Sequence, residues 1–273
     1  MKLSTSLIAI ATITLLSGCV VVMSSSYANF HTQKTLTLEV SQLSTLVIDA
    51  GSGSLEVRGQ ADIDEIRVIA DIYTDKKYKN NYQLSLTDSK DKAYLTAKIN
   101  NSSGFWQGRS PYIDVQVIVP QRMMLDINDS SGDLLLSNIH AHIELIDGSG
   151  GIDITHVIGN LTLNDGSGEL NIAHIRGDVT IKDGSGDMQL DDIQGNVNIN
   201  DGSGSIHAQN ITGTAVLEDG SGDMMVRNVE GMVTIEDGSG DIDVQSVGGL
   251  KLLETGSGGL RVKSVKGYFE VDG

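Results

Sequence analysis

The chain has 273 residues, a formal net charge of −17 and a single cysteine. A surface this acidic excludes binding of nucleic acid or anionic lipid through surface charge, because phosphate-rich partners need basic side chains. One cysteine excludes an intramolecular disulfide framework, so the fold must be stable without one.

Residues 1–18 have the organisation of an export signal. Lys2 gives a positive start, residues 7–16 are apolar, and Leu16-Ser17-Gly18-Cys19 closes the segment. The apolar part is too short to span a membrane. The closing residues resemble the lipobox of bacterial lipoproteins, which implies that Cys19 becomes the lipidated first residue of the mature chain. Val20 follows it where an Asp would retain the protein at the inner membrane, so the resemblance implies the outer membrane if the cell has one. The alternative is that Cys19 is only the end of the apolar signal.

Residues 19–33 lack hydrophobic periodicity and are predicted to be a tether. Residues 34–128 are predicted to form a β-rich N-terminal cap, because four stretches alternate between polar and apolar residues. These stretches are 64–72, 82–86, 93–99 and 112–119. We expect antiparallel strands that pair with one another and cover the N-terminal end of the repeats that follow. Residues 45–57 contain an isolated relative of the repeat turn and predict an early coil.

The loop over residues 101–111 carries Phe105 and Trp106, and Trp106 is the sole tryptophan. Aromatic side chains on a Gly-rich loop favour recognition of a carbohydrate or a protein, so these two residues are candidate ligand contacts. The alternative is a hydrophobic lid folded over the cap.

The rest of the chain is a repeat built around the letters Asp-Gly-Ser-Gly. Six copies start at Asp147, Asp165, Asp183, Asp201, Asp219 and Asp237, each 18 residues after the last. Relatives start at Asp129 and Thr255 in the same register. Eight units therefore cover residues 129–273 without an insertion.

Each unit predicts two short strands and two turns. In residues 183–200, Met188 alternates with polar neighbours after the Gly-rich turn, and Val197 and Ile199 do so in a second stretch. One unit cannot bury its own apolar face, whereas stacked units can, at about 4.8 Å per rung. The sequence therefore predicts an all-β fold, a parallel β-solenoid of 18-residue coils with an N-terminal β-rich cap.

Residues at the same place of successive units form a column, and some columns hold only residues typical of turns. Glycine recurs at the second, fourth and thirteenth places of the unit, which indicates positive φ or close backbone approach. The tenth place holds only Asn, Asp, His or Ser, and the first three tolerate the left-handed region best. In the last units, Lys251 stands where the fifteenth column is otherwise apolar and predicts a local register slip. Arg261, Lys263 and Lys266 predict edge protection or a docking face for an acidic partner.

The first-place aspartates would form a file with about 4.8 Å between neighbours. The simplest account is an Asx turn, in which each carboxylate accepts the amides of the next residues. The alternative is a row of Ca²⁺ ions, because oxygen ligands suit Ca²⁺. The low-ranking Ca²⁺ candidates are Asp147, Asp165, Asp183, Asp201, Asp219 and Asp237. His156 and His174 stack in the tenth column, where turn residues are expected rather than a metal site.

The Gly-Ser-Gly turn, the apolar-x-apolar strand after it and the Ile/Val-x-Gly turn resemble the bacterial putative-adhesin family of β-strand-repeat domains of unknown function. The resemblance covers about residues 36–273 and includes Val119-Pro120-Gln121 before the first full unit. The resemblance implies a repeat fold and an adhesive role, and it supplies no catalytic residues.

We expect no enzyme and no cofactor, because the repeats carry no long loops and no base at a fixed offset from a serine. The predicted function is that of a non-enzymatic envelope lipoprotein, an adhesin or scaffold whose acidic solenoid faces a polymer or protein. Its expected partners are the membrane, through lipid on Cys19, and a polysaccharide or an envelope protein, but no nucleic acid. The alternatives are a Ca²⁺-binding solenoid and, last, a carbohydrate-active enzyme.

Overall fold

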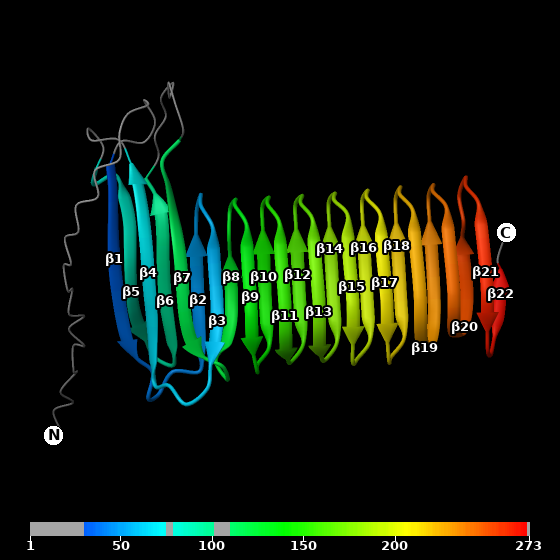
Figure 1. Ribbon diagram of the computed structural model, residues 1–273, viewed down its shortest axis with the longest axis horizontal. Helices are drawn as coiled ribbons and strands as arrows, with labels where there is room; N and C mark the ends of the chain where they lie inside the picture. Colours follow the sequence, from blue (N-terminus) through cyan, green and yellow to red (C-terminus); the bar gives the residue numbers. More distant parts are fainter. Residues whose placement is uncertain (1–29, 75–78, 101–109, 272–273) are drawn as a thin grey trace, which may run out of the picture.

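The computed structural model describes residues 30–74, 79–100 and 110–271. Within these ranges the chain forms 22 strands joined by turns, with no helix. Consequently no helix in the described part is long and apolar enough to cross a membrane. Figure 1 shows an elongated stack of strands, with β1 to β7 grouped at one end and β22 at the other.

The repeats form a parallel β-solenoid, as the sequence predicts. The first strands of the coils are β9 (Leu134–Ile139), β11 (Ile152–Ile158), β13 (Leu170–Arg176), β15 (Met188–Ile193) and β17 (Ile206–Ile211). The second strands are β8 (Met124–Asn128), β10 (Ile143–Asp147), β12 (Leu161–Asp165), β14 (Val179–Asp183), β16 (Val197–Asp201) and β18 (Ala215–Asp219). First strands pair with first strands and second with second, all in parallel and 18 residues apart. Residues of the inward columns are almost fully buried, so neighbouring coils provide the interior that one coil lacks.

The tenth-place residue has the predicted left-handed backbone in every coil, but it lies inside a strand rather than in a turn between strands. All eight residues have φ between 54° and 61°: Asn138, His156, His174, Asp192, Asn210, Asn228, Ser246 and Ser264. Residues with short polar side chains pass through this region at low cost. The choice of residues in this column is therefore explained by backbone conformation.

The predicted register slip occurs between β19 (Met224–Asp237) and β20 (Ile242–Glu254). The pairing shifts after Val229 and again after Ile235, so that Val233 faces Leu250 and Ile235 faces Leu252. Leu250 and Leu252 are consequently the buried residues of this coil, and Leu253, which strict 18-residue spacing places in the inward column, is 40% exposed. The irregularity keeps Lys251 out of the interior, because a buried unpaired ammonium would be costly.

The N-terminal strands form the predicted cap. β1 (Phe30–Glu39) and β7 (Tyr112–Pro120) each pair antiparallel with β4 (Glu65–Thr74), and β5 (Tyr82–Ser89) pairs antiparallel with β6 (Lys92–Ile99). The cap continues into the solenoid through two short strands (Figure 1). β2 (Thr45–Ala50) pairs in parallel with β6 and β8, and β3 (Leu55–Gln60) with β7 and β9, which confirms the early coil.

One boundary differs from the prediction. β1 begins at Phe30, inside residues 19–33, which the sequence assigns to the tether. Residues 30–33 carry only one strongly apolar side chain, so period-two alternation gives no signal there. Their strand conformation comes from pairing with β4, where Phe30 faces Thr74.

The last coil consists of β21 (Leu260–Val265) and β22 (Phe269–Val271), which both pair with β20. In the described part of the chain no further strand lies beyond them. Among the described residues, β21 and β22 each pair with a neighbouring rung on one side only.

Candidate functional site

Three residues singled out from the sequence lie outside the described ranges. These are Cys19, the expected lipidation site, and Phe105 and Trp106, the candidate ligand contacts. Their roles stay predictions.

The first-place aspartates form a continuous file inside the solenoid. Asp147, Asp165 and Asp183 lie opposite one another on adjacent rungs, and the same register continues through Asp201, Asp219 and Asp237. Each ends a second strand whose inward residues alternate with exposed ones, as in Ile143, Leu145 and Asp147. The seven first-place aspartates, from Asp129 to Asp237, are all buried, and at most 6% of each residue is exposed.

One carboxylate oxygen of most of these residues accepts a backbone amide. The amide of Ser185 donates to Oδ1 of Asp183 at 3.2 Å, and the Asp201, Asp219 and Asp237 turns repeat this bond at 3.0 to 3.2 Å. In the first turn, Ser130 occupies the glycine place and its own amide donates to Asp129 at 2.9 Å. These contacts are the Asx turns that the sequence predicts.

The second oxygen is left without a partner among the described residues. This holds for Oδ2 of Asp129, Asp183, Asp201, Asp219 and Asp237. At Asp147 and Asp165 the backbone amides of Gly148, Gly166 and Ser167 lower the pKa, so these two carboxyls are not without partners. A buried carboxylate oxygen without a hydrogen bond is unfavourable, and the file repeats it on successive rungs. The Asx turns therefore supply a measured hydrogen bond to one oxygen in five of the seven carboxyls.

Burial raises the pKa of every carboxyl in the file, and repulsion by a neighbouring carboxylate of the file adds to this effect in five of the seven. Loss of solvent is the largest cause and raises the pKa of Asp129 to about 7, with a smaller contribution from the neighbouring Asp147 carboxylate. The same two causes raise the pKa of Asp147, Asp183 and Asp201 to about 6, against the opposing effect of backbone amides. Burial also raises the pKa of Asp165, Asp219 and Asp237. Protonation removes the like-charge repulsion and gives a carboxyl a donor for an unpartnered oxygen nearby.

The geometry of the file suits protons better than a row of metal ions. Ca²⁺ takes six to eight oxygen ligands, whereas each rung supplies one carboxyl beside a tight glycine turn. The described residues contain no group of three or more His, Cys, Asp or Glu side chains that could hold a metal. The calcium hypothesis stays a prediction of the sequence.

His156 of β11 and His174 of β13 lie on adjacent rungs, with their rings tilted by 44°. The rings of His156 and His174 lie 4.9 Å apart, and Nδ1 of His174 is 2.9 Å from Oδ2 of Asp192 on the next rung. The His174 contact is the main reason that the pKa of Asp192 is lowered. All three residues have the left-handed backbone of their column, which explains their position without a ligand.

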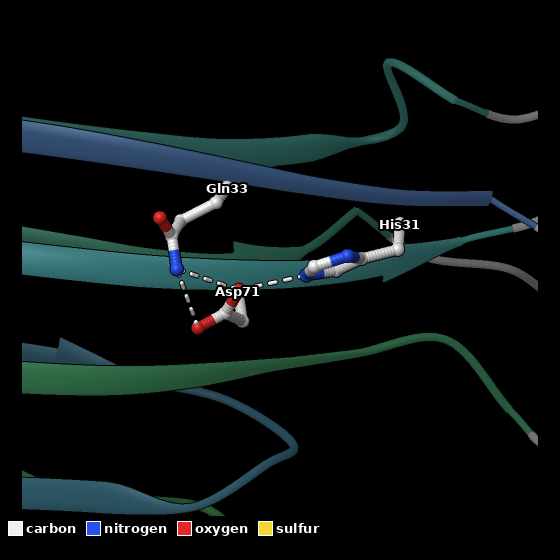
Figure 2. Close-up of polar contacts among 3 residues, drawn as sticks. All are labelled: His31, Gln33 and Asp71. Carbon is white, nitrogen blue, oxygen red and sulfur yellow. Dashed lines mark hydrogen bonds and ion pairs between the residues drawn. The ribbon is translucent and has the colours of Figure 1, made fainter. Parts of the chain in front are cut away.

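The sequence does not predict a polar and aromatic cluster that the structure shows on the cap. Figure 2 shows Asp71 of β4 between His31 and Gln33 of β1. Oδ1 of Asp71 is 2.7 Å from Nε2 of His31 and accepts Nε2 of Gln33 at 3.1 Å. The rings of His31, Tyr73 and Tyr112 stack across three strands at 4.6 Å. Burial, followed by Asp71, raises the pKa of Tyr73. These contacts tie the β1 edge to the cap.

The comparisons with solved structures return bacterial proteins at low identity. A crystal structure described as a putative adhesin from Bacteroides fragilis NCTC 9343 has 11% identity and a TM-score of 0.46, covering 88% of this chain and 97% of that one. A putative cell adhesion protein from Clostridium sporogenes ATCC 15579 has 11% identity and a TM-score of 0.38, covering 89% and 99%. A putative adhesin from Parabacteroides distasonis ATCC 8503 has 14% identity and a TM-score of 0.34, covering 88% and 97%.

No curated protein matches the chain. A family model does match, over residues 43–270, which include the early coil and almost all of the solenoid. The chain therefore belongs to the family described as Toastrack DUF4097.

Proposed function

We propose that this protein is a non-enzymatic lipoprotein of the cell envelope that displays its solenoid as a flat adhesion or scaffold surface. The observation that carries the proposal is the regularity of the exposed columns. On β12, β14 and β16, Thr162, Thr180 and Asn198 lie on adjacent rungs, all exposed. Asn164, Lys182 and Asn200 form a second exposed column beside them.

We define the second-strand face as these six residues. Their hydroxyl, amide and ammonium groups lie on three successive rungs about 4.8 Å apart, which offers a polymer several hydrogen-bonding groups at a regular spacing. Many weak contacts on one rigid surface give high avidity even where each contact is weak. An array without loops does not enclose a substrate, which is why binding rather than catalysis is proposed.

The polymer hypothesis is tested with the soluble chain from residue 20 onward and immobilised envelope polysaccharides. The variant T162R/N198R places two bulky cations on the second-strand face. We expect it to bind at least tenfold more weakly than the parent to the polysaccharide that the parent binds. The matched control, Q189R/H207R, adds the same charge to exposed positions of β15 and β17 and should bind like the parent. Equal binding by both variants would remove this face as the contact surface.

The anchor is tested separately at Cys19. Lipidation needs the thiol, so Cys19→Ser should leave the protein without lipid. We expect the parent in the detergent phase after Triton X-114 partition of whole cells and the variant in the aqueous phase. A variant that still enters the detergent phase would contradict anchoring through Cys19.

A further inference from the structure

The last coil offers an open strand edge. In the inner coils the sixth-place amide donates to the next rung, as Ile242 does to the Gly259 carbonyl at 2.8 Å and Met224 to the Asp241 carbonyl at 2.9 Å. Leu260 occupies the same place in β21, and within the described residues no rung follows it. Because the parallel ladder repeats, the outward N–H and C=O groups of Leu260 and Phe269 face the position of an added strand.

The same end exposes the apolar interior. Leu260 is 45% exposed, whereas the sixth-place residue of each of the other seven coils is at most 2% exposed. Phe269 and Val271 of β22 are 53% and 47% exposed. A strand laid against this edge would bury aliphatic side chains on these residues as every inner coil does.

Basic side chains flank the β21 half of this edge on a chain with net charge −17, whereas β22 carries Glu270. Arg261 and Lys263 alternate with the apolar residues of β21, and Lys266 follows in the turn. Nη1 of Arg261 reaches Oδ2 of Asp243 on the previous rung at 3.4 Å and is otherwise exposed. Acidic side chains on an added rung would lie opposite Arg261 and Lys263, in the position that Asp243 holds on the inner side.

A shallow hollow adjoins the edge. It has a volume of about 320 Å³ and is lined by Leu260, Arg261 and residues of the three preceding coils, including His207, Met225 and Asp243. The hollow gives a side chain of the added strand a place beside the ladder. It lies on the first-strand side, so β21 is the strand from which binding is expected to begin.

We propose that the C-terminal end of the solenoid binds an extended acidic segment of a partner protein, which adds to β21 as one further rung. Such a segment alternates aliphatic residues, which cover Leu260 and Val262, with Asp or Glu residues, which face Arg261 and Lys263. A second copy of this chain fits less well, because two such ends would bring Arg261, Lys263 and Lys266 against their own equivalents. This inference is independent of polymer binding by the second-strand face.

The probe is a fluorescein-labelled peptide of eight residues that alternates Ile or Val with Asp, with anisotropy as the readout. The parent should bind it, and R261E/K263E should bind it at least tenfold more weakly. The control, R58E/R176E, makes the same change in net charge at exposed positions of β3 and β13, outside both proposed binding surfaces, and should bind like the parent. Circular dichroism melts confirm that all three proteins are folded.

Two further peptides separate strand addition from simple charge attraction. A peptide with Lys in place of Asp should not bind, and the acidic peptide with N-methylated backbone on alternate residues should lose binding, since it cannot complete the ladder. The proposal is overturned if the parent does not bind the acidic peptide at millimolar concentration, or if R261E/K263E binds it like the parent. It is also overturned if N-methylation has no effect, or if sedimentation shows that the parent dimerises through this end.

Discussion

Replacing Gly186 by alanine is expected to lower the free energy of unfolding by about 3–5 kcal/mol, since backbone strain and overpacking each cost about 1–3 kcal/mol. Gly186 has φ of 147°, and an added Cβ would lie 1.6 Å from the carbonyl oxygen of Gly168 on the previous rung. The positive φ and the close carbonyl oxygen both belong to the backbone, so a change of side-chain rotamer cannot relieve either of them. The two coils would have to separate, which breaks the ladder on which the interior depends.

The matched control is Gly151→Ala, also in a coil turn. A Cβ there would meet only the Asp133 carboxylate, at 3.5 Å, and its φ lies outside the region that disfavours side chains. Thermal unfolding followed by circular dichroism should show Gly186→Ala melting well below the parent and Gly151→Ala close to it. Equal melting of the two variants would mean that the turns are not in such close contact.

Lowering the pH from 8 to 5 is expected to stabilise the protein. The folded pKa of Asp183 and Asp201 is about 6, above the ordinary value of 3.8. A group whose pKa is raised by folding contributes its full stability below the unfolded pKa, and this contribution is lost as the pH rises through the folded pKa. At pH 5, one unit below the folded pKa, each of these two groups contributes about 1.4 kcal/mol, at about 1.4 kcal/mol per pKa unit, so the pair contributes about 3 kcal/mol. The melting temperature should therefore be about 10 °C higher at pH 5 than at pH 8, at about 2–4 °C per kcal/mol.

The variant D183N/D201N isolates the file. Asparagine keeps the oxygen that accepts the serine amide but carries no charge, so the variant should melt above the parent at pH 8 and depend less on pH. E144Q/D153N removes two charges from exposed positions and should keep the parent's pH dependence. If D183N/D201N varies with pH as steeply as the parent does, the file is not the origin of the effect.

The solenoid was predictable because the same physical constraint recurs in every coil. A fixed spacing of 18 residues aligns inward residues such as Ile175 and Ile193, and a tenth-place residue such as Asp192 marks the left-handed backbone position. Even the slip at Lys251 was visible, since a lysine in an apolar column has to leave it. Each of these inferences compares one rung with the next, and errors in one unit are corrected by the others.

The burial of the aspartates was less apparent, although a signal exists. The alternation of Ile143 and Leu145 continues directly to Asp147, so period two places the carboxyl on the inward side. The glycines that follow suggested a surface turn instead. The sequence predicted the file and its Asx bonds, but not that its second oxygens would be buried without partners.

The cap could be predicted only as a set of strands. Its contacts join residues far apart in the chain, such as His31 with Asp71, and no repeat brings them into register. The start of β1 at Phe30 likewise depends on pairing with β4 rather than on its own pattern. Tertiary pairing outweighs local pattern in such a region, which is why the boundary of the predicted tether was wrong.

The account of the site depends most on the claim that the aspartate file is buried and partly protonated near neutral pH. Carboxyl ¹³C chemical shifts of aspartate-labelled protein, followed from pH 3 to 9, measure this directly. The account predicts titration of Asp129 at about pH 7 and of Asp183 and Asp201 at about pH 6, whereas Asp192, whose pKa is lowered by His174, titrates below its ordinary range. If the Asp183 and Asp201 signals titrate near 3.8 with the surface aspartates, the carboxyls are solvated and the claim is wrong.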